Sequence, residues 1–394
     1  MPSDRAEPLP FARPWIGDEE VEAVTEVLRS GWLTTGARTH EFERRFAESV
    51  GAPAALALSS GTAALHLALI AAGVGADDVV LTTPLTFCST VHVIEHLGAR
   101  PVLVDVDPDS LNVSPAALAH TVEQLDRPPA VILPVHLAGR PVDLAAVHAV
   151  AEQVGATVVE DAAHAQGASV AGRPIGALTG SGPRQAACFS FYVTKNMTTG
   201  EGGMLTGDEQ FVEDARRWSL HGMSRDAWRR YDAGGAWRYD VTVPGFKYNM
   251  TDLQAALGLV QLGRSEQLLE RRRQIAATYD TAFTDLVAVR PVSRIDEPGH
   301  AWHLYLLQVD PQQSPVDRDG FIARVNAAGI GTSVHFIPIH HLDYYRRHYG
   351  FAPGDFPVAS AAFERLVSLP IYPRMTDEDV SDVIDAVRRA VEQP

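Results

Sequence analysis

Short apolar runs alternate with amphipathic stretches between residues 55 and 206 of the chain. Several runs are followed by segments with apolar residues at helical spacing, as in residues 115–125 and 144–154. This alternation is typical of βαβ units, which place parallel strands in one sheet and cover both of its faces with helices. Two further strand candidates, around residues 187–191 and 203–206, flank a polar loop. The pattern predicts an α/β fold with a mostly parallel sheet.

The pattern changes after residue 250. A long helix is predicted over residues 251–283, because no Gly-Pro break interrupts that stretch. A mixed unit follows, with strands expected around residues 302–309 and 331–335, a helix around residues 317–328 and two C-terminal helices.

The length of 394 residues exceeds that of one ordinary hydrophobic core and favours two or three structural units. We expect a large domain, residues 1–286, that includes the N-terminal segment and the long connecting helix. Residues 287–394 are expected to form a small α+β domain.

Charge and cysteine content narrow the classes of partner. The chain has 33 Lys and Arg residues against 49 Asp and Glu residues, so its formal net charge of −16 disfavours nucleic acid and anionic membranes as partners. Cys88 and Cys188 are too few for a disulfide framework or a multi-thiolate metal site. The sequence shows neither a signal peptide nor a stretch as long and apolar as a membrane span. We therefore expect a cytoplasmic protein.

Three segments carry candidate chemistry, although the signatures of phosphate-loop NTPases, dinucleotide dehydrogenases and zinc peptidases are absent. Residues 59–62 lie between an expected strand and an expected helix, where backbone N–H groups can bind an anion. A plain helix N-cap explains the same residues. Asp161 and His164 follow a strand at the edge where parallel sheets bind ligands. A turn-capping Asp and a buried structural His are the alternatives.

The third segment, residues 189–203, places Lys195 among apolar, hydroxyl and glycine residues just after a strand. Burial lowers the pKa of a lysine, and the neutral amine is the form that attacks a carbonyl to give a Schiff base. A solvated loop lysine is the alternative. The spacing of the segment favours the reactive amine.

Four motifs occur together in the chain, namely Ser60-Gly61-Thr62, Phe87 in Pro-Leu-Thr-Phe, Glu160-Asp161-Ala-Ala-His164, and Ser190-Phe-x-x-x-Lys195 with Gly200-Glu-Gly-Gly203. This combination resembles the fold-type I pyridoxal-phosphate enzymes and, more closely, the DegT-type (DnrJ/StrS-like) nucleotide-sugar aminotransferases. The likeness covers nearly the whole chain, from residues 16–20 to residues 329–336. It implies an aspartate aminotransferase-like fold, with a mostly parallel seven-stranded sheet and a small α+β C-terminal domain.

The resemblance also implies a pyridoxal 5'-phosphate cofactor, which would be bound covalently to Lys195 as an aldimine and become pyridoxamine phosphate during turnover. Lys195 would then shuttle a proton between the sugar carbon and the cofactor. Asp161 would pair with the pyridinium nitrogen and make the ring an electron sink. The other implied cofactor contacts are His164 at the phenolic oxygen, Phe87 on the ring face, and Ser60, Gly61, Thr62 and Ser190 at the phosphate.

In relatives, an Asn near the segment that corresponds to residues 245–256 reaches the phosphate from the neighbouring subunit. The resemblance therefore implies a homodimer with shared active sites, and we assign this role to Asn249, with Lys247 as second choice. His335 is expected near the sugar or its nucleotide phosphates. Its proximity in sequence to His340 and His341 is weak evidence for a metal, and no metal site is predicted.

The lysine at position 195 also distinguishes branches of the family, because the related sugar 3-dehydrases have histidine there. Transamination is therefore expected, with L-glutamate as amino donor. Residues 30–36 and 301–305, together with His335 and Phe336, look most like the branch that aminates carbon 4. This likeness favours a 4-keto-6-deoxyhexose linked to dTDP or UDP. Amination at carbon 3, amination of a cyclitol ketone, and a non-catalytic regulator that binds the cofactor remain alternatives.

Overall fold

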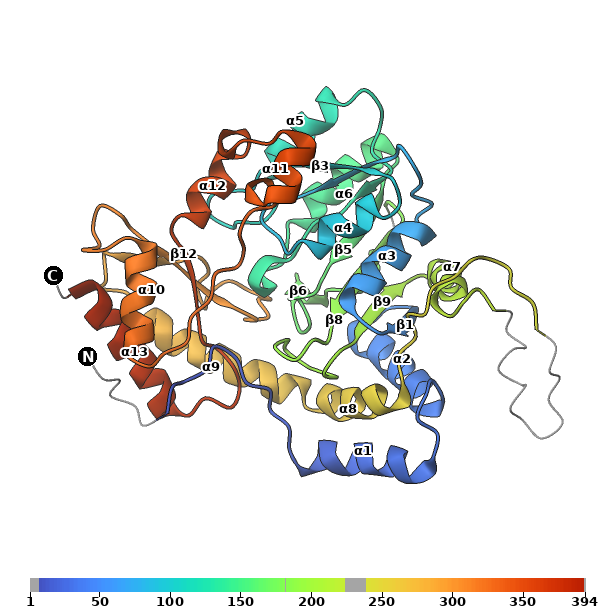
Figure 1. Ribbon diagram of the computed structural model, residues 1–394, viewed down its shortest axis with the longest axis horizontal. Helices are drawn as coiled ribbons and strands as arrows, with labels where there is room; N and C mark the ends of the chain where they lie inside the picture. The colour runs from blue at the N-terminus through green and yellow to red at the C-terminus, as the bar shows by residue number, and fades with distance from the viewer. Residues whose placement is uncertain (1–6, 181, 224–238, 393–394) are drawn as a thin grey trace.

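The central element of the protein is a seven-stranded sheet, seen in a computed structural model that describes residues 7–180, 182–223 and 239–392 (Figure 1). The strand order is β1-β9-β8-β5-β4-β2-β3, and only β9 runs antiparallel to its neighbours. The predicted α/β fold with a mostly parallel sheet is thus confirmed. The strands are β1 (Ala54–Leu58), β2 (Val79–Thr82), β3 (Arg100–Leu103), β4 (Val131–Ile132), β5 (Thr157–Asp161), β8 (Gln185–Ser190) and β9 (Gly203–Gly207).

Helices cover both faces of this sheet because the strands bury side chains on both sides. In β1, Leu56 and Leu58 pack with α3 and α7, whereas Ala55 and Ala57 face α2 and α8. This alternation is the two-residue period of a strand. Helices α5 and α6 cover the second face beside β2 and β4. The bounds are α2 (Ala37–Val50), α3 (Gly61–Ala71), α4 (Ser89–Glu95), α5 (Pro115–Gln124), α6 (Leu144–Val154), α7 (Glu209–Ser219) and α8 (Asp252–Gly263).

The helix predicted over residues 251–283 is two helices, α8 and α9 (Ser265–Ala282), so the prediction of one unbroken helix is wrong. Arg264 leaves the helical conformation, with φ −106° and ψ 2°. Gly263 before it has low helix propensity. The Arg264 guanidinium donates to buried Glu20 of α1 (Asp18–Ser30) at 2.8 Å and lies over the ring of Trp15. These contacts tie the break between the helices to the N-terminal segment.

A second, three-stranded antiparallel sheet lies in the C-terminal part, in the order β10-β11-β12. Figure 1 shows α9 leading from the large sheet towards this smaller one. Its core includes residues of α9, α10 and α13. The bounds are β10 (Val289–Pro291), β11 (Tyr305–Val309), β12 (Leu366–Leu369), α10 (Arg318–Ala327), α11 (Asp343–Tyr349), α12 (Pro357–Phe363) and α13 (Asp377–Glu392).

Two expectations for the C-terminal part are wrong. Residues 331–335 form no strand; they make a single bridge, Ser333 to Ser368, before the chain turns towards the large sheet. Three helices, α11, α12 and α13, follow where two were expected. Tyr345 of α11 packs against α4 and β3, whereas α12 packs both on loops of the large sheet and on Leu306 and Leu366 of the smaller one.

Two short strands, β6 (Ser169–Val170) and β7 (Arg173–Pro174), form a separate hairpin. Within the part of the chain that the structure describes, no helix combines the length and apolar character needed to cross a membrane.

Candidate active site

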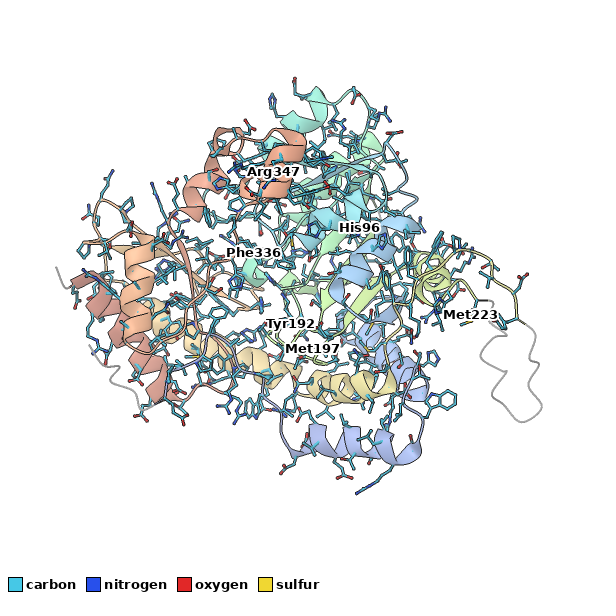
Figure 2. All side chains as sticks on the ribbon, viewed as in Figure 1. His96, Tyr192, Met197, Met223, Phe336 and Arg347 are labelled. Atoms are coloured by element: carbon cyan, nitrogen blue, oxygen red, sulfur yellow. The ribbon has the colours of Figure 1, made fainter. Side chains whose placement is uncertain are left out.

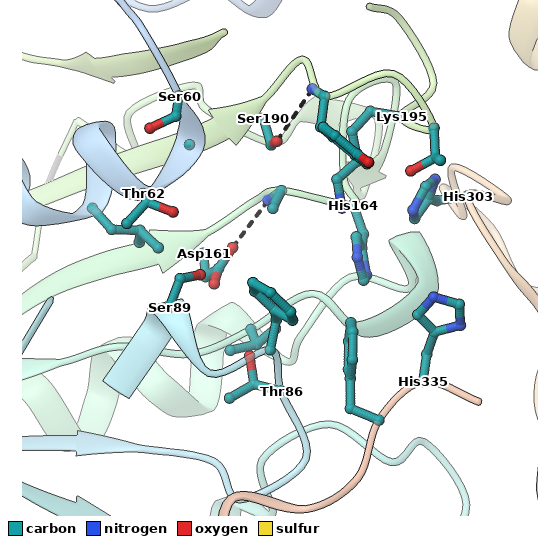
Figure 3. Close-up of a pocket in the computed structure, with 18 of the residues that line it drawn as sticks. Ser60, Thr62, Thr86, Ser89, Asp161, His164, Ser190, Lys195, His303 and His335 are labelled. Atoms are coloured by element: carbon teal, nitrogen blue, oxygen red, sulfur yellow. Dashed lines mark hydrogen bonds between the residues drawn. The ribbon is translucent and has the colours of Figure 1, made fainter. Parts of the chain in front are cut away.

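A cavity of about 340 Å³ lies where β5 and β8 end and α3 begins. Its position agrees with the rule that parallel sheets bind ligands at the carboxyl ends of their strands. Figure 2 places Tyr192 and Phe336, both lining residues, in the middle of the molecule. The predicted site residues that line the cavity are Ser60, Gly61, Thr62, Phe87, Asp161, His164, Ser190, Lys195 and His335 (Figure 3).

Lys195 is held in this cavity by a tight turn after β8. Its backbone N–H donates to the carbonyl of Tyr192 at 2.9 Å, and Thr199 donates its N–H to Phe191 at 3.0 Å. The side chain reaches the cavity but is otherwise enclosed by protein. Burial lowers the pKa of Lys195 to about 8, and the Asp161 carboxylate opposes this shift. The neutral amine, which is the nucleophilic form, is therefore far more populated near neutral pH than in an ordinary lysine.

Amine-directed labelling tests whether the pKa of Lys195 is lowered. In ligand-free protein the rate of acylation of Lys195 should rise with pH to a midpoint near 8, well below the value of about 10.4 for an unperturbed lysine. Peptide mapping by mass spectrometry resolves the reaction from that of Lys247, the only other lysine of the chain. A midpoint above about 10 would show that the amine is solvated as in an ordinary loop lysine.

Asp161 is a buried carboxylate at the end of β5. Its Oδ2 accepts a hydrogen bond from the Thr90 hydroxyl at 2.8 Å, and its Oδ1 accepts from the N–H of Ala163 at 3.1 Å. Burial raises the pKa of Asp161, while these hydrogen bonds and Lys195 lower it. Among the described residues it makes no ion pair within 4.0 Å. A buried charge without such a partner favours a cationic group of a ligand.

The opposite end of the cavity suits an anion. The Ser60 side chain caps α3 by accepting from Ala63 N–H at 3.0 Å, so the helix N-terminus faces the cavity with its remaining N–H groups. A Cβ added to Gly61 would lie 2.8 Å from the Cβ of Ser190. The backbone of α3 therefore approaches β8 closely, which brings the Thr62 and Ser190 hydroxyls to the same end.

Aromatic rings form the remaining walls. Phe87 is 57 % exposed and contacts Phe336, with 6.0 Å between ring centroids. His164 accepts from the N–H of Ala138 at 3.3 Å, and burial lowers its pKa well below the ordinary value, so it is neutral. Burial also lowers the pKa of His335 to about 4. The cavity thus combines a flat apolar surface with neutral hydrogen-bonding groups.

Lys247 and Asn249 do not line this cavity in their own chain. The Asn249 amide donates to Thr35 Oγ1 at 2.7 Å and accepts from Lys247 Nζ. Asn249 lines a different pocket, beside β1 and α7. A role for these two residues in the cavity therefore requires a second copy of the chain.

Sequence reasoning assigned no role in the site to several residues that the structure places there, among them Thr90, Tyr192, His303 and Phe336. Thr90 lies four residues after Thr86, with which it shares a hydrogen bond of 2.8 Å, and no motif marks it. His303 and Phe336 come from the C-terminal part, more than 100 residues after Lys195. Their partners in space could be found only once the fold was known.

The arrangement of His, Cys, Asp and Glu side chains bears on whether the protein could bind a metal ion. No group of three or more His, Cys, Asp or Glu residues is arranged to hold a metal ion within residues 7–180, 182–223 and 239–392. His340 and His341 both make hydrogen bonds of 2.9 Å with the Ser360 hydroxyl.

Comparison with known proteins extends the picture from the site to the whole chain. Residues 14–388 match the model of the DegT/DnrJ/EryC1/StrS aminotransferase family. The spore coat polysaccharide biosynthesis protein SpsC of Bacillus subtilis is 48 % identical over 385 residues, which is 97 % of each chain.

Two solved structures are similar over nearly their whole length. Spr1654 of Streptococcus pneumoniae, described as a sugar aminotransferase, matches in its pyridoxamine-phosphate form with a TM-score of 0.89 and 34 % identity, over 98 % of this chain and 99 % of that one. It was also solved in its pyridoxal-phosphate form. Helicobacter pylori PseC, an aminotransferase of pseudoaminic acid biosynthesis, matches with a TM-score of 0.89 and 26 % identity, over 98 % and 100 % of the two chains.

The cavity fits pyridoxal phosphate on its own geometry. It offers a buried carboxylate at Asp161 for a ring nitrogen, an amine at Lys195 for an aldehyde, an aromatic face at Phe87, and the α3 N-terminus for a phosphate. The chain belongs to the DegT/DnrJ/EryC1/StrS family and is a pyridoxal-phosphate-dependent sugar aminotransferase.

Proposed function

We propose that the enzyme transfers an amino group from L-glutamate to the 4-keto group of a dTDP- or UDP-linked 4-keto-6-deoxyhexose, in amino-sugar biosynthesis. The observation that carries amino transfer is the placement of Lys195 and Asp161 in one cavity. The choice of carbon 4 is supported by the sequence of residues 30–36 and 301–305 and by His335 and Phe336. The pathways named for SpsC and PseC, spore coat polysaccharide and pseudoaminic acid, agree with a role in making modified sugars.

The residues of the cavity divide into holding and proton-transfer roles. Gly61, Thr62 and Ser190 would bind the cofactor phosphate, and Phe87 would cover a face of its ring. The bound cofactor supplies an electron sink for the carbon that bears the amine. Asp161 holds the proton on the ring nitrogen, because a buried carboxylate favours a cation beside it.

Lys195 would move the proton of the reacting carbon. Its pKa of about 8 allows Nζ to accept a proton and return it near neutral pH, as general acid–base catalysis requires. Neutral His164 would orient the cofactor by hydrogen bonding at the phenolic oxygen without adding a competing positive charge.

The proposal includes a homodimer in which each chain contributes residues to the cavity of the other. Asn249 and Lys247 lie outside the cavity of their own chain, and Asn249 lines another pocket and accepts a hydrogen bond from Lys247. In a homodimer they would reach the phosphate end of the partner's site, adding donors where the α3 N-terminus already favours an anion.

A substrate panel tests the proposal. The full-length protein loaded with pyridoxal phosphate is incubated with glutamate and one ketone at a time. The ketones are 3-keto and 4-keto sugars linked to dTDP or UDP and a cyclitol ketone, and products are identified by mass spectrometry and NMR. We expect amination at carbon 4 of a 6-deoxyhexose. Turnover of 3-keto sugars or cyclitol ketones alone would overturn the regiochemistry or the substrate class, and cofactor binding without any turnover would favour a regulator.

A further inference from the structure

A third histidine, His303, faces the cavity from the segment before β11 (Figure 3). Its ring centroid lies 4.4 Å from that of His164. It also contacts Asn196, the residue that follows Lys195, through a distance of 3.2 Å between Nδ1 and Oδ1. His303 therefore lies beside the residues that act on the reacting carbon.

The hydrogen bonds of Asn196 determine which nitrogen of His303 carries the proton. The Asn196 amide nitrogen donates to two backbone carbonyls, those of Ala301 at 2.7 Å and Gln166 at 3.2 Å. Its Oδ1 consequently faces His303, and an amide oxygen only accepts. Nδ1 of His303 must therefore be the donor. In the neutral ring, Nε2 then presents a lone pair.

The His303 imidazole is neutral, its Nε2 is available to a ligand, and the backbone around it is held in place. Burial lowers the pKa of His303 well below its ordinary value, and the positive charges of Lys195 and Arg272 act in the same direction. Within the described residues, Nε2 makes no hydrogen bond. The buried Arg272 guanidinium donates to the carbonyls of Trp302, His303 and Ile371 at 3.2, 3.3 and 2.6 Å.

We propose that Nε2 of His303 accepts a hydrogen bond from the sugar hydroxyl next to the keto carbon, which makes His303 a specificity-determining residue. The inference rests on the proposed function. In a 4-keto-6-deoxyhexose, carbon 3 is the only neighbour of the ketone that bears a hydroxyl, so the donor is the 3-hydroxyl.

The same geometry separates the two substrates. Apart from its reacting amine, glutamate carries only carboxylates, which accept hydrogen bonds and cannot donate to Nε2. His303 should therefore speed the sugar half-reaction and have almost no effect on the rate of the glutamate half-reaction. A cavity built to pair with a hydroxyl also rejects an analogue that leaves the acceptor unpaired.

Two substitutions of His303 test the inference, each half-reaction being followed separately by the cofactor's absorbance. His303→Phe removes the acceptor, and kcat/KM for the keto sugar should fall about 10- to 100-fold, while the glutamate half-reaction changes less than about 3-fold. His303→Gln places an amide oxygen near the position of Nε2 and should recover most of the loss. His300→Asn is the matched control, because His300 is buried on the same segment outside the cavity, and Asn can keep the bond that Nδ1 accepts from Trp302 N–H.

A 3-deoxy-4-keto nucleotide sugar provides the decisive comparison. The wild-type enzyme should discriminate against it by the factor lost in His303→Phe, and the variant should not discriminate. Calorimetric titration of the aminated product and its 3-deoxy analogue into the pyridoxal-phosphate form should show the same pattern in Kd. Equal losses in both half-reactions, or undiminished discrimination by His303→Phe, would overturn the inference alone. A wild-type enzyme that aminates no nucleotide sugar would overturn the proposed function as well.

Discussion

Replacing Lys195 by alanine should lower kcat/KM for amino transfer by at least about 10⁴-fold, because one residue supplies both the nucleophile and the proton-transferring base. No other lysine can take over within the chain, since Lys247 lies outside the cavity. Lys195→Arg should be equally inactive: a guanidinium keeps the charge but stays protonated. The measurement is the rate of each half-reaction with saturating cofactor.

Folding controls separate this loss from damage to the structure. The ligand-free protein holds Lys195 at a depressed pKa of about 8, so near neutral pH it bears the cost of burying a charged amine. Lys195→Ala removes that cost, and its thermal unfolding midpoint at pH 7 should equal or exceed that of the wild type. Residual turnover above about 1 % of wild type in a correctly folded variant would contradict the role.

Asp161→Asn should reduce kcat about 10- to 1000-fold, because a carboxylate raises the pKa of a neighbouring cation by about 1 to 3 units and an amide does not. Both half-reactions should slow together, since the ring nitrogen is needed in each. Asp143→Asn is the matched control: Asp143 caps α6 away from the cavity, and asparagine caps helices equally well. Loss in one half-reaction only would contradict the assignment.

The raised pKa of Asp161 also predicts the direction in which Asp161→Asn changes the stability of the protein. Burial raises the folded-state pKa of Asp161 above its unfolded value, so this carboxyl costs stability as pH rises through the folded pKa. At pH 7 the ligand-free Asp161→Asn protein should therefore unfold at the same or a higher temperature than the wild type. A lower midpoint would indicate that the carboxylate is needed to hold the strand end, through Thr90 and Ala163, rather than to bind a ligand.

Sequence patterns were sufficient for the sheet but less so for the C-terminal part. Short apolar runs and stretches with apolar residues at helical spacing predict their elements from local information, as residues 144–154, observed as α6, illustrate. The break at Arg264 depends on Glu20 and Trp15, about 245 residues away in sequence, so no local pattern shows it. Residues 331–335, Gly-Thr-Ser-Val-His, make only one bridge to β12 before the chain reaches the cavity at His335. The domain boundary at residue 286 stays a prediction.

The residues of the candidate site likewise fall into those that the sequence predicts and those that it does not. Lys195, Asp161 and Gly61 follow strands of one sheet, so topology alone brings them together. Thr90 and His303 reach the site through tertiary packing, and only their neighbours in space reveal them. Asn249 and Lys247 were assigned by resemblance to a site shared between subunits, and their place in a single chain leaves that assignment as a prediction.

The close backbone approach at the end of the cavity proposed to bind the phosphate restricts how this protein can evolve. A Cβ at Gly61 would overlap Ser190, and one at Gly203 would overlap the backbone of Ser60. These segments meet main chain to main chain, so exchanging side chains there has almost no freedom to reshape the pocket. Altered sugar preference is therefore expected to arise mainly in the opposite wall, where the side chains of His303, His335 and Phe336 line the cavity. The end of the cavity built from main chain tolerates few substitutions. The wall built from side chains is where point mutations can change the substrate that the enzyme accepts.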